Sequence, residues 1–126
     1  GIALNKGSWM TATANDGRRG KVMSEPIILG DAQSRKVWIG GQELDIHKSL
    51  AIENKSPSGF AWGYMGSGPS QLALAILLEL TDKDTALRLY HPFKEAFIAT
   101  VPDSADLVIP VSKAKSWLLE NEEYGL

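Results

Sequence analysis

The 126-residue chain carries 13 basic and 15 acidic side chains, a formal net charge of −2, and no cysteine. Its length suits one domain, with a core that buries roughly two-thirds of the unfolded surface. The lack of cysteine excludes a disulfide framework, a zinc knuckle and a thiol nucleophile, and it favours a cytoplasmic protein.

Residues 1–22 differ in kind from the rest of the chain. They are small, polar and glycine-bearing, with four basic side chains against one acidic, whereas the remaining residues hold 9 basic and 14 acidic groups. The segment lacks helical or strand periodicity and the apolar core of a signal peptide, so we interpret it as an N-terminal arm or upstream extension that packs along a sheet edge or on a second subunit. The acidic remainder lacks the positive surface that nucleic acids require, so no nucleic-acid partner is expected.

Short β-prone runs dominate the first half of the remaining sequence. Lys36–Ile39 and Gln42–Ile46 flank Gly40-Gly41, a dipeptide that can take positive φ, which predicts a hairpin. A second pair of strands, Leu50–Glu53 and Phe60–Tyr64, is predicted around a longer polar turn.

After Gly68 the hydrophobic pattern of the sequence changes from one typical of strands to one typical of a helix. Pro69 suits the first position of a helix, which is predicted to run through Gln71–Thr81 and to be capped by Ser67 or Gly68. The run Leu72–Leu78 is apolar on every side, so this helix should be central, with sheet on one face and helices on the other. The run is also far shorter than the roughly 18 residues of a membrane-spanning helix, so no membrane insertion is expected.

The last third of the sequence predicts helical segments before and after one more strand. Asp84 is a plausible N-cap, and Pro92 should kink or break the helix after His91. A strand is expected at Leu107–Ile109, followed by a helix that Ser112 caps, with Ala114, Trp117, Leu118 and Tyr124 facing inward. Residues 23–126 are therefore predicted to form a single α+β domain: a small antiparallel sheet of three to five strands packed against about three helices, one of them central and fully apolar.

Several stretches together resemble a known family. They are "NKSPSGFAWGYMGSGPSQLALAILLEL", "ALRLYHPFKEAF" and "SKAKSWL", spread over about residues 37–119. They are similar to short prokaryotic and phage-borne proteins known only as a domain of unknown function, with the pattern GFxWGYxGSGPxQLALAILL. Met65 stands where that pattern has a small residue. The resemblance implies an accessory role in mobile elements and supplies no activity, cofactor or catalytic residue.

The junction Gly66-Ser67-Gly68 admits two interpretations. Its backbone N–H groups could bind an anion at the N-terminus of the following helix, where the helix dipole favours negative charge. The loop lacks the lysine of a P-loop and the spacing of a dinucleotide fingerprint, however, so the same residues could simply form a turn that starts the helix.

Phe60, Trp62 and Tyr64 would share one face of an extended strand. Such a face would belong either to the core or to a protein interface, and if exposed it would be the leading contact surface.

Glu43, Asp45 and His47 would likewise point together from a strand, with the donor types of a carboxylate–imidazole site. Alternation along a half-buried strand explains the same spacing without a metal, and His91 lies in another element, so no metal or cofactor is expected. Neither histidine has serine and acid partners that the sequence identifies as a triad.

Two function classes remain. The preferred one is a non-enzymatic accessory interaction module that forms a homo-oligomer or binds a protein partner, and it needs no catalytic group. The alternative is a small-molecule or anion-binding domain, with or without enzymatic activity, centred on Gly66–Pro69, with Trp62 and Tyr64 as walls. It requires these residues and the Glu43, Asp45 and His47 cluster to converge in one pocket.

Overall fold

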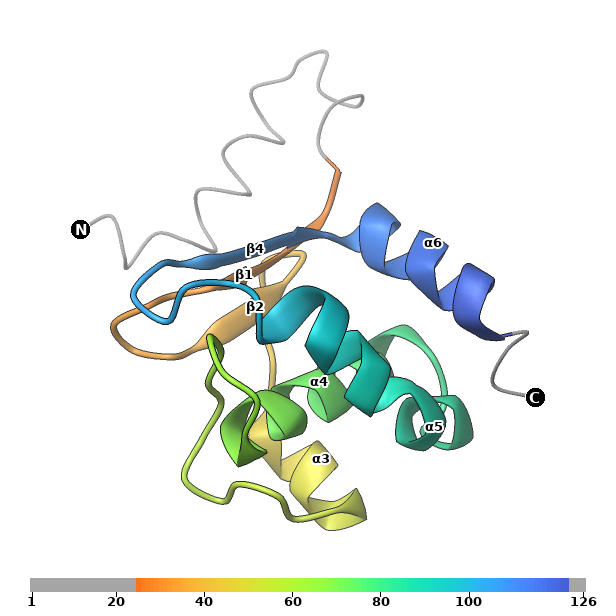
Figure 1. Ribbon diagram of the computed structural model, residues 1–126, viewed down its shortest axis with the longest axis horizontal. Helices are drawn as coiled ribbons and strands as arrows, with labels where there is room; N and C mark the ends of the chain where they lie inside the picture. The colour runs from red at the N-terminus through yellow and green to blue at the C-terminus, as the bar shows by residue number, and fades with distance from the viewer. Residues whose placement is uncertain (1–24, 123–126) are drawn as a thin grey trace.

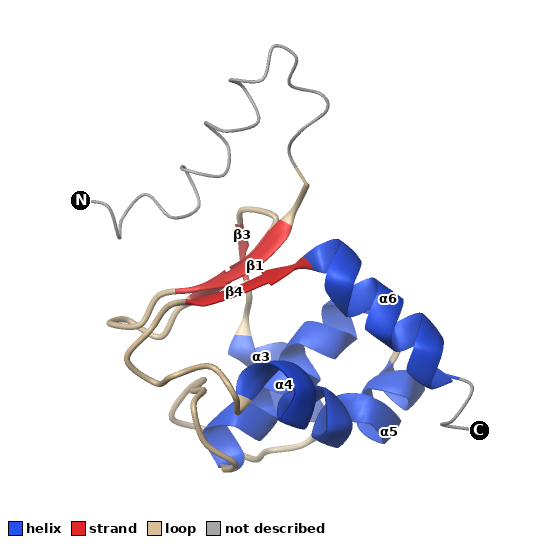
Figure 2. Cartoon of the chain, turned by 45° about the horizontal axis from the view of Figure 1, so that its top comes forward, coloured by secondary structure: helices blue, strands red, loops and turns tan. Residues whose placement is uncertain are grey.

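The computed structural model describes residues 25–122, which form a four-stranded antiparallel sheet and a set of helices on one side of it (Figure 1). The sheet has the spatial order β3-β2-β1-β4 and comprises β1 (Ile27–Gly30), β2 (Val37–Ile39), β3 (Gln42–Glu43) and β4 (Leu107–Pro110). The helices are α3 (Ile46–Ile52), α4 (Ser67–Leu80), α5 (Lys83–Phe93), the π-helix η2 (Lys94–Ile98) and α6 (Val111–Glu122). Figure 2 shows the sheet as one layer with the helices below and beside it. The predicted α+β fold is confirmed.

The β2–β3 hairpin is the predicted one, with a shorter second strand. Gly40 and Gly41 have φ of 59° and 86°, the positive values that a tight hairpin turn of this kind requires. β3 ends at Glu43, two residues into the predicted Gln42–Ile46. The prediction failed there because Asp45 is an N-cap: its side chain accepts the His47 backbone N–H at 3.0 Å, and α3 begins at Ile46.

The two other predicted strands of the first half are wrong. Leu50–Glu53 falls largely in α3, which ends at Ile52, and Phe60–Tyr64 lies in the loop between α3 and α4. This loop does not pair with the sheet because it turns sharply at Gly59 and Gly63, whose φ values are 141° and 94°. The alternation of large and small side chains around Trp62 reflects burial in a loop and not a strand ladder.

β1 is a central strand that the sequence analysis did not assign. It pairs with β2 on one side and β4 on the other. Its residues, Ile-Ile-Leu-Gly, read as a short apolar run without alternation, a pattern that periodicity alone cannot separate from a piece of helix.

α4 is the central helix of the domain, as predicted. Every residue from Gly68 to Leu78 is buried, and the helix packs against α3, α5 and η2. Its apolar side chains join one cluster with Ile28, Leu107 and Ile109 of the sheet. Pro69 is the third and not the first helical residue, and Gly66 is the N-cap in place of Ser67 or Gly68. Proline is tolerated there because N–H groups of a first turn have no partner within the helix.

α5 and η2 form one continuous bent path, as the Pro92 pattern allowed. The cap is Asp82 and not Asp84: its carboxylate accepts the Thr85 backbone N–H at 2.8 Å, and this hydrogen bond lowers the pKa of Asp82. Pro92 lies inside α5, which ends at Phe93 and passes directly into the π-helical turn. Such a turn is a common way to accommodate a bend in a helix.

β4 matches the predicted strand Leu107–Ile109 and passes directly into α6. The predicted N-cap, Ser112, lies inside the helix, where its hydroxyl donates to Glu25 Oε2 at 2.6 Å. Ala114 and Leu118 face inward as predicted, and Trp117 packs edge-on against Phe93 and Phe97. Tyr124 and the predicted arm of residues 1–22 lie outside the described residues. Within the described range, each helix is too short or too polar to cross a bilayer.

Candidate functional site

Trp62 contacts both the β1–β2 loop and the loop before β4, and so holds these loops together at one end of the sheet. It is fully buried, and its indole Nε1 donates to the Ala105 carbonyl at 2.8 Å. Arg35, at the end of the β1–β2 loop, lies 4.5 Å above the Trp62 ring and donates through Nη2 to the Asp103 carbonyl at 2.6 Å. The Nη1 atom of Arg35 is buried without an acceptor among the described residues, and the negative face of the ring compensates for this. The role of Trp62 is therefore structural.

Gly63 permits a close approach between this loop and residue 103. Its φ is 94°, and a Cβ at this position would lie 2.6 Å from the Asp103 backbone nitrogen. Its N–H donates to the Ile98 carbonyl at 3.2 Å. Only glycine satisfies both the backbone conformation and the space.

The predicted aromatic set is divided between core and surface. Phe60 and Trp62 are in the core, whereas Tyr64 is 51% exposed. Of the three, only Tyr64 offers substantial surface to a partner. The three residues therefore do not form the shared strand face that the alternation suggested.

The junction at the start of α4 is closely packed. A Cβ at Gly66 would collide with the Tyr64 ring, and one at Gly68 would lie 2.7 Å from the Ala61 Cβ. Gly66 caps α4 without a side-chain hydrogen bond, and Ser67 is exposed. Packing against Ala61 explains Gly68, whereas the ring that meets Gly66 belongs to the half-exposed Tyr64, and anion binding by Gly66, Ser67 and Gly68 stays a prediction.

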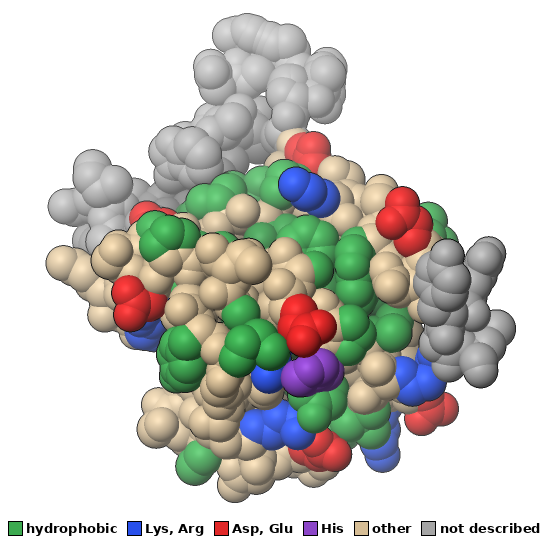
Figure 3. Space-filling view, in the orientation of Figure 1, with side chains coloured by type: hydrophobic (Ala, Val, Ile, Leu, Met, Phe, Trp, Pro, Cys, Tyr) green, Lys and Arg blue, Asp and Glu red, His purple; other side chains and the backbone are tan. Residues whose placement is uncertain are grey.

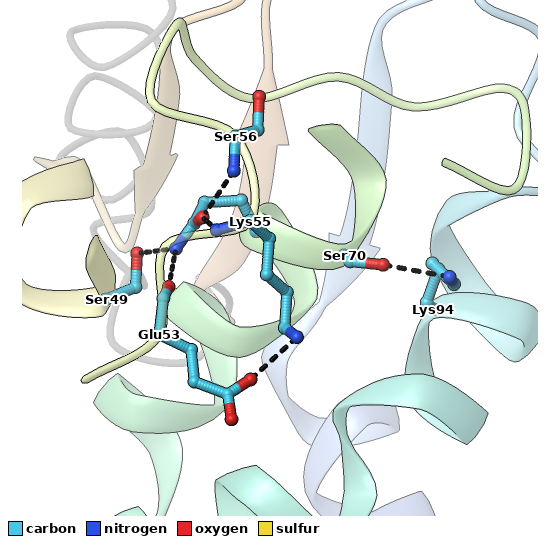
Figure 4. Close-up of polar contacts among 7 residues, drawn as sticks. Ser49, Glu53, Lys55, Ser56, Ser70 and Lys94 are labelled. Carbon is cyan, nitrogen blue, oxygen red and sulfur yellow. Dashed lines mark hydrogen bonds and ion pairs between the residues drawn. The ribbon is translucent and has the colours of Figure 1, made fainter. Parts of the chain in front are cut away.

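Gln71 is a buried hydrogen-bonding centre that sequence reasoning missed. Its Oε1 accepts the backbone N–H groups of Lys55 and Ser56 at 2.6 and 2.8 Å. Its Nε2 donates to the Ser49 hydroxyl at 2.9 Å and to the Glu53 carbonyl at 3.1 Å (Figure 4). One amide therefore ties α4 to the end of α3 and to the loop beyond it. The signal was a glutamine at the start of an otherwise apolar helix.

Lys94 is buried opposite the first turn of α4. Its residue is 6% exposed, and its ammonium donates to the Ser70 hydroxyl at 2.8 Å, as the labelled pair in Figure 4 shows. Among the described residues no carboxylate lies within ion-pair distance of this ammonium. A positive charge near a helix N-terminus, with one hydroxyl as its partner, is an unfavourable arrangement.

We therefore expect Lys94→Met to leave the free energy of unfolding unchanged or to raise it by about 1 kcal/mol, because an apolar side chain of similar length removes an uncompensated charge. Urea unfolding at neutral pH measures this change. Lys83→Met, an exposed substitution at the start of α5, is the control and should change stability by less than about 0.5 kcal/mol. A loss of several kcal/mol in the Lys94 variant would show that the ammonium is stabilising.

The predicted Glu43, Asp45 and His47 cluster does converge on one cleft, although not from a single strand. The cleft has a volume of about 660 Å³ and is lined by the β2–β3 hairpin, the start of α3 and the loop Ser58–Phe60. His47 Nδ1 lies 2.9 Å from Asp45 Oδ1, and the hydrogen bond from the His47 backbone N–H is the main cause that lowers the pKa of Asp45. Within residues 25–122 no three His, Cys, Asp or Glu side chains are grouped as metal ligands. The Gly66–Pro69 loop does not line this cleft.

The outer face of the sheet is the second unusual surface. Strand register places Leu29, Trp38 and Val108 side by side on the face opposite the core, and it pairs Ile27 with Pro110 on that same face. Val108 is 56% exposed. Sheets with one solvated face normally carry polar residues there, so an apolar outer face is exceptional. Figure 3 shows hydrophobic side chains on the side of the molecule where β4 and α6 lie.

The described residues define a small α+β domain in which one layer of helices, centred on α4, covers one side of an antiparallel sheet. The chain belongs to a family of unknown function (DUF6166), whose model matches residues 28–120, from β1 to α6. Comparison with curated proteins and with solved structures gives no significant match. Membership of a family of unknown function is thus confirmed, while the GFxWGY pattern as its hallmark and a phage origin stay predictions.

Proposed function

We propose that the protein is a non-enzymatic interaction module that self-associates through the outer face of its sheet. One observation carries the proposal: the outer face of the sheet carries Leu29, Trp38 and Val108, with Glu43 beside Trp38 at its rim, while the described helices cover the opposite face. Leu29 is only 6% exposed on this face and Val108 is 56% exposed, and leaving the apolar surface of Val108 against water forgoes roughly 25 cal/mol for each Å². A contact that covers these side chains recovers that free energy.

A second copy of the chain is the occupant that this surface fits best. In a two-fold contact the same patch meets itself, so an uncharged centre avoids like-charge repulsion. Ile27, Leu29, Trp38, Val108 and Pro110 carry no charge, and the one charged neighbour given by the register, Glu43, pairs with Trp38 on the edge strand β3. β4 is moreover an edge strand of the described sheet, and such edges favour association.

The apolar surface continues beyond the β4 edge. A groove of about 210 Å³ lies there; its lining includes Val108, Pro110, Phe97 and Val101, and Lys113 is its one charged residue. A partner packed on the outer face can therefore extend contacts around the edge, which helps it reach the roughly 1,200–2,000 Å² of a stable interface.

Sedimentation of the full chain tests this proposal. The wild type should sediment as a dimer, and Val108→Lys should weaken association at least about tenfold, because it places an ammonium within an apolar contact. Leu119→Lys is the matched control: Leu119 is an exposed leucine on α6, outside the patch, and its variant should remain dimeric. A monomeric wild type at its highest soluble concentration, or equal effects of the two substitutions, would overturn the proposal.

An accessory role in mobile elements and a cytoplasmic location belong to the same proposal, supported by the resemblance and by the absence of cysteine. The alternative function, an anion-binding domain centred on Gly66–Pro69, has no comparable support. It required convergence with Glu43, Asp45 and His47, and the cleft gathers these three residues without that loop.

A further inference from the structure

We infer that the cleft beside the β2–β3 hairpin binds a short zwitterionic peptide of two or three residues. The cleft measures about 660 Å³, which lies within the 300–1,000 Å³ typical of ligand sites. Its walls come from three separate segments between residues 34 and 60: the β1–β2 loop, the turn from β3 into α3, and the loop Ser58–Phe60. The cleft meets the outer sheet face at Glu43, which pairs with Trp38, and the inference does not rest on self-association.

The cleft offers charges of both signs that protein groups leave available. The Lys36 ammonium and the Glu43 carboxylate have no ion-pair or hydrogen-bond partner among the described residues. The Leu44 N–H donates to the Val37 carbonyl at 2.8 Å, which makes Lys36 and Asp45 neighbours across the hairpin, yet they do not form an ion pair. A ligand with one ammonium and one carboxylate can therefore engage both kinds of group, and a singly charged ligand would leave one kind unused.

The rest of the lining suits a peptide. Leu44 and Phe60 are buried side chains whose edges line the cleft, together with Ile46, and they provide apolar contacts between the charged groups. The pairing of Trp38 with Glu43 lies between two hydrogen-bonded positions of the hairpin, so the Glu43 N–H and carbonyl point away from β2 towards the open edge. These two groups can pair with the backbone of an extended peptide, as edge strands do in peptide-binding domains.

An NMR titration of the full chain with L-leucyl-L-leucine tests the inference. We expect saturable amide shifts at residues 34–36, 43–47 and 58–60. The N-acetyl and C-terminal amide derivatives should each bind about fivefold more weakly, because each lacks one of the charged ends. Shifts that do not saturate, shifts centred on other residues, or equal binding of either blocked derivative would overturn the inference.

Variants separate the charged groups from the general shape of the cleft. Lys36→Gln should weaken the unblocked dipeptide about fivefold and leave the C-terminal amide unaffected. Glu43→Gln should show the converse: it should weaken binding of the C-terminal amide, which keeps the ammonium, and leave binding of the N-acetyl derivative, which lacks the ammonium, unchanged. Lys83→Gln on α5, outside the cleft, is the control and should bind as the wild type does. Equal behaviour of all three variants towards the unblocked dipeptide would contradict the assignment.

Discussion

Replacing Gln71 by leucine is expected to lower the free energy of unfolding by about 3–5 kcal/mol. Leucine is similar in size to glutamine but is apolar and cannot form hydrogen bonds. The substitution therefore leaves four polar groups without their partner: the Lys55 and Ser56 backbone N–H groups, the Ser49 hydroxyl and the Glu53 carbonyl. Each such group costs about 1–3 kcal/mol when it stays buried, and entry of water would recover part of this. Urea unfolding monitored by circular dichroism gives the value.

The control for this prediction is Gln42→Leu, a glutamine exposed in β3. It should change stability by less than about 0.5 kcal/mol. A loss below about 1 kcal/mol in the Gln71 variant would show that the loop after α3 is held by other contacts. The adjoining pair Lys55 and Glu53, 2.6 Å apart, is the nearest alternative.

Replacing Trp62 by alanine should destabilise the protein by a similar amount, about 3–5 kcal/mol. The variant would lose a fully buried indole, the hydrogen bond to the Ala105 carbonyl and the ring beneath Arg35. It would also leave space beside Gly30, where the indole is so close that a Cβ would lie 2.7 Å from it. Thermal unfolding measures the loss.

Tyr64→Ala is the matched control because Tyr64 is an aromatic residue of the same loop with half its surface exposed. Its loss should be about 1 kcal/mol or less. Equal losses in the two variants would contradict the assignment of Trp62 as the residue that fastens the loops.

The sequence correctly predicted α4, the β2–β3 turn and β4, because neighbouring residues alone determine these parts of the fold. The seven apolar residues Leu72–Leu78 cover every side of a helix, so burial of α4 required no knowledge of its neighbours. Gly40-Gly41 forced the hairpin turn through its positive φ, and the run at Leu107–Ile109 was a strand of the expected length.

The failures arose where two local structures share one pattern. The alternation from Glu43 to His47 suits a strand, but the Asp45 carboxylate caps a helix in the same five residues. Phe60 and Trp62 alternate with small residues because they enter the core from a loop. β1 was missed because four apolar residues carry no period, and its place between β2 and β4 depends on contacts far away in sequence.

The candidate sites show the same division. The grouping of Glu43, Asp45 and His47 survived the error in secondary structure, because residues so close in sequence stay close in either form. The apolar outer face could not be read from the sequence, since it depends on the register that sets Leu29 beside Trp38 and Val108. The buried partners of Gln71 and Lys94 likewise come from distant segments.

The most direct test of the self-association claim is an isotope-filtered NOE experiment on a mixture of labelled and unlabelled full-length chains. The account predicts intermolecular NOEs at the methyl groups of Val108, which is 56% exposed in one chain, because a second copy covers the outer face of the sheet. Purely intramolecular NOEs at these methyls, including any from residues 1–24 of the same chain, would contradict it and show that the face is covered within one molecule.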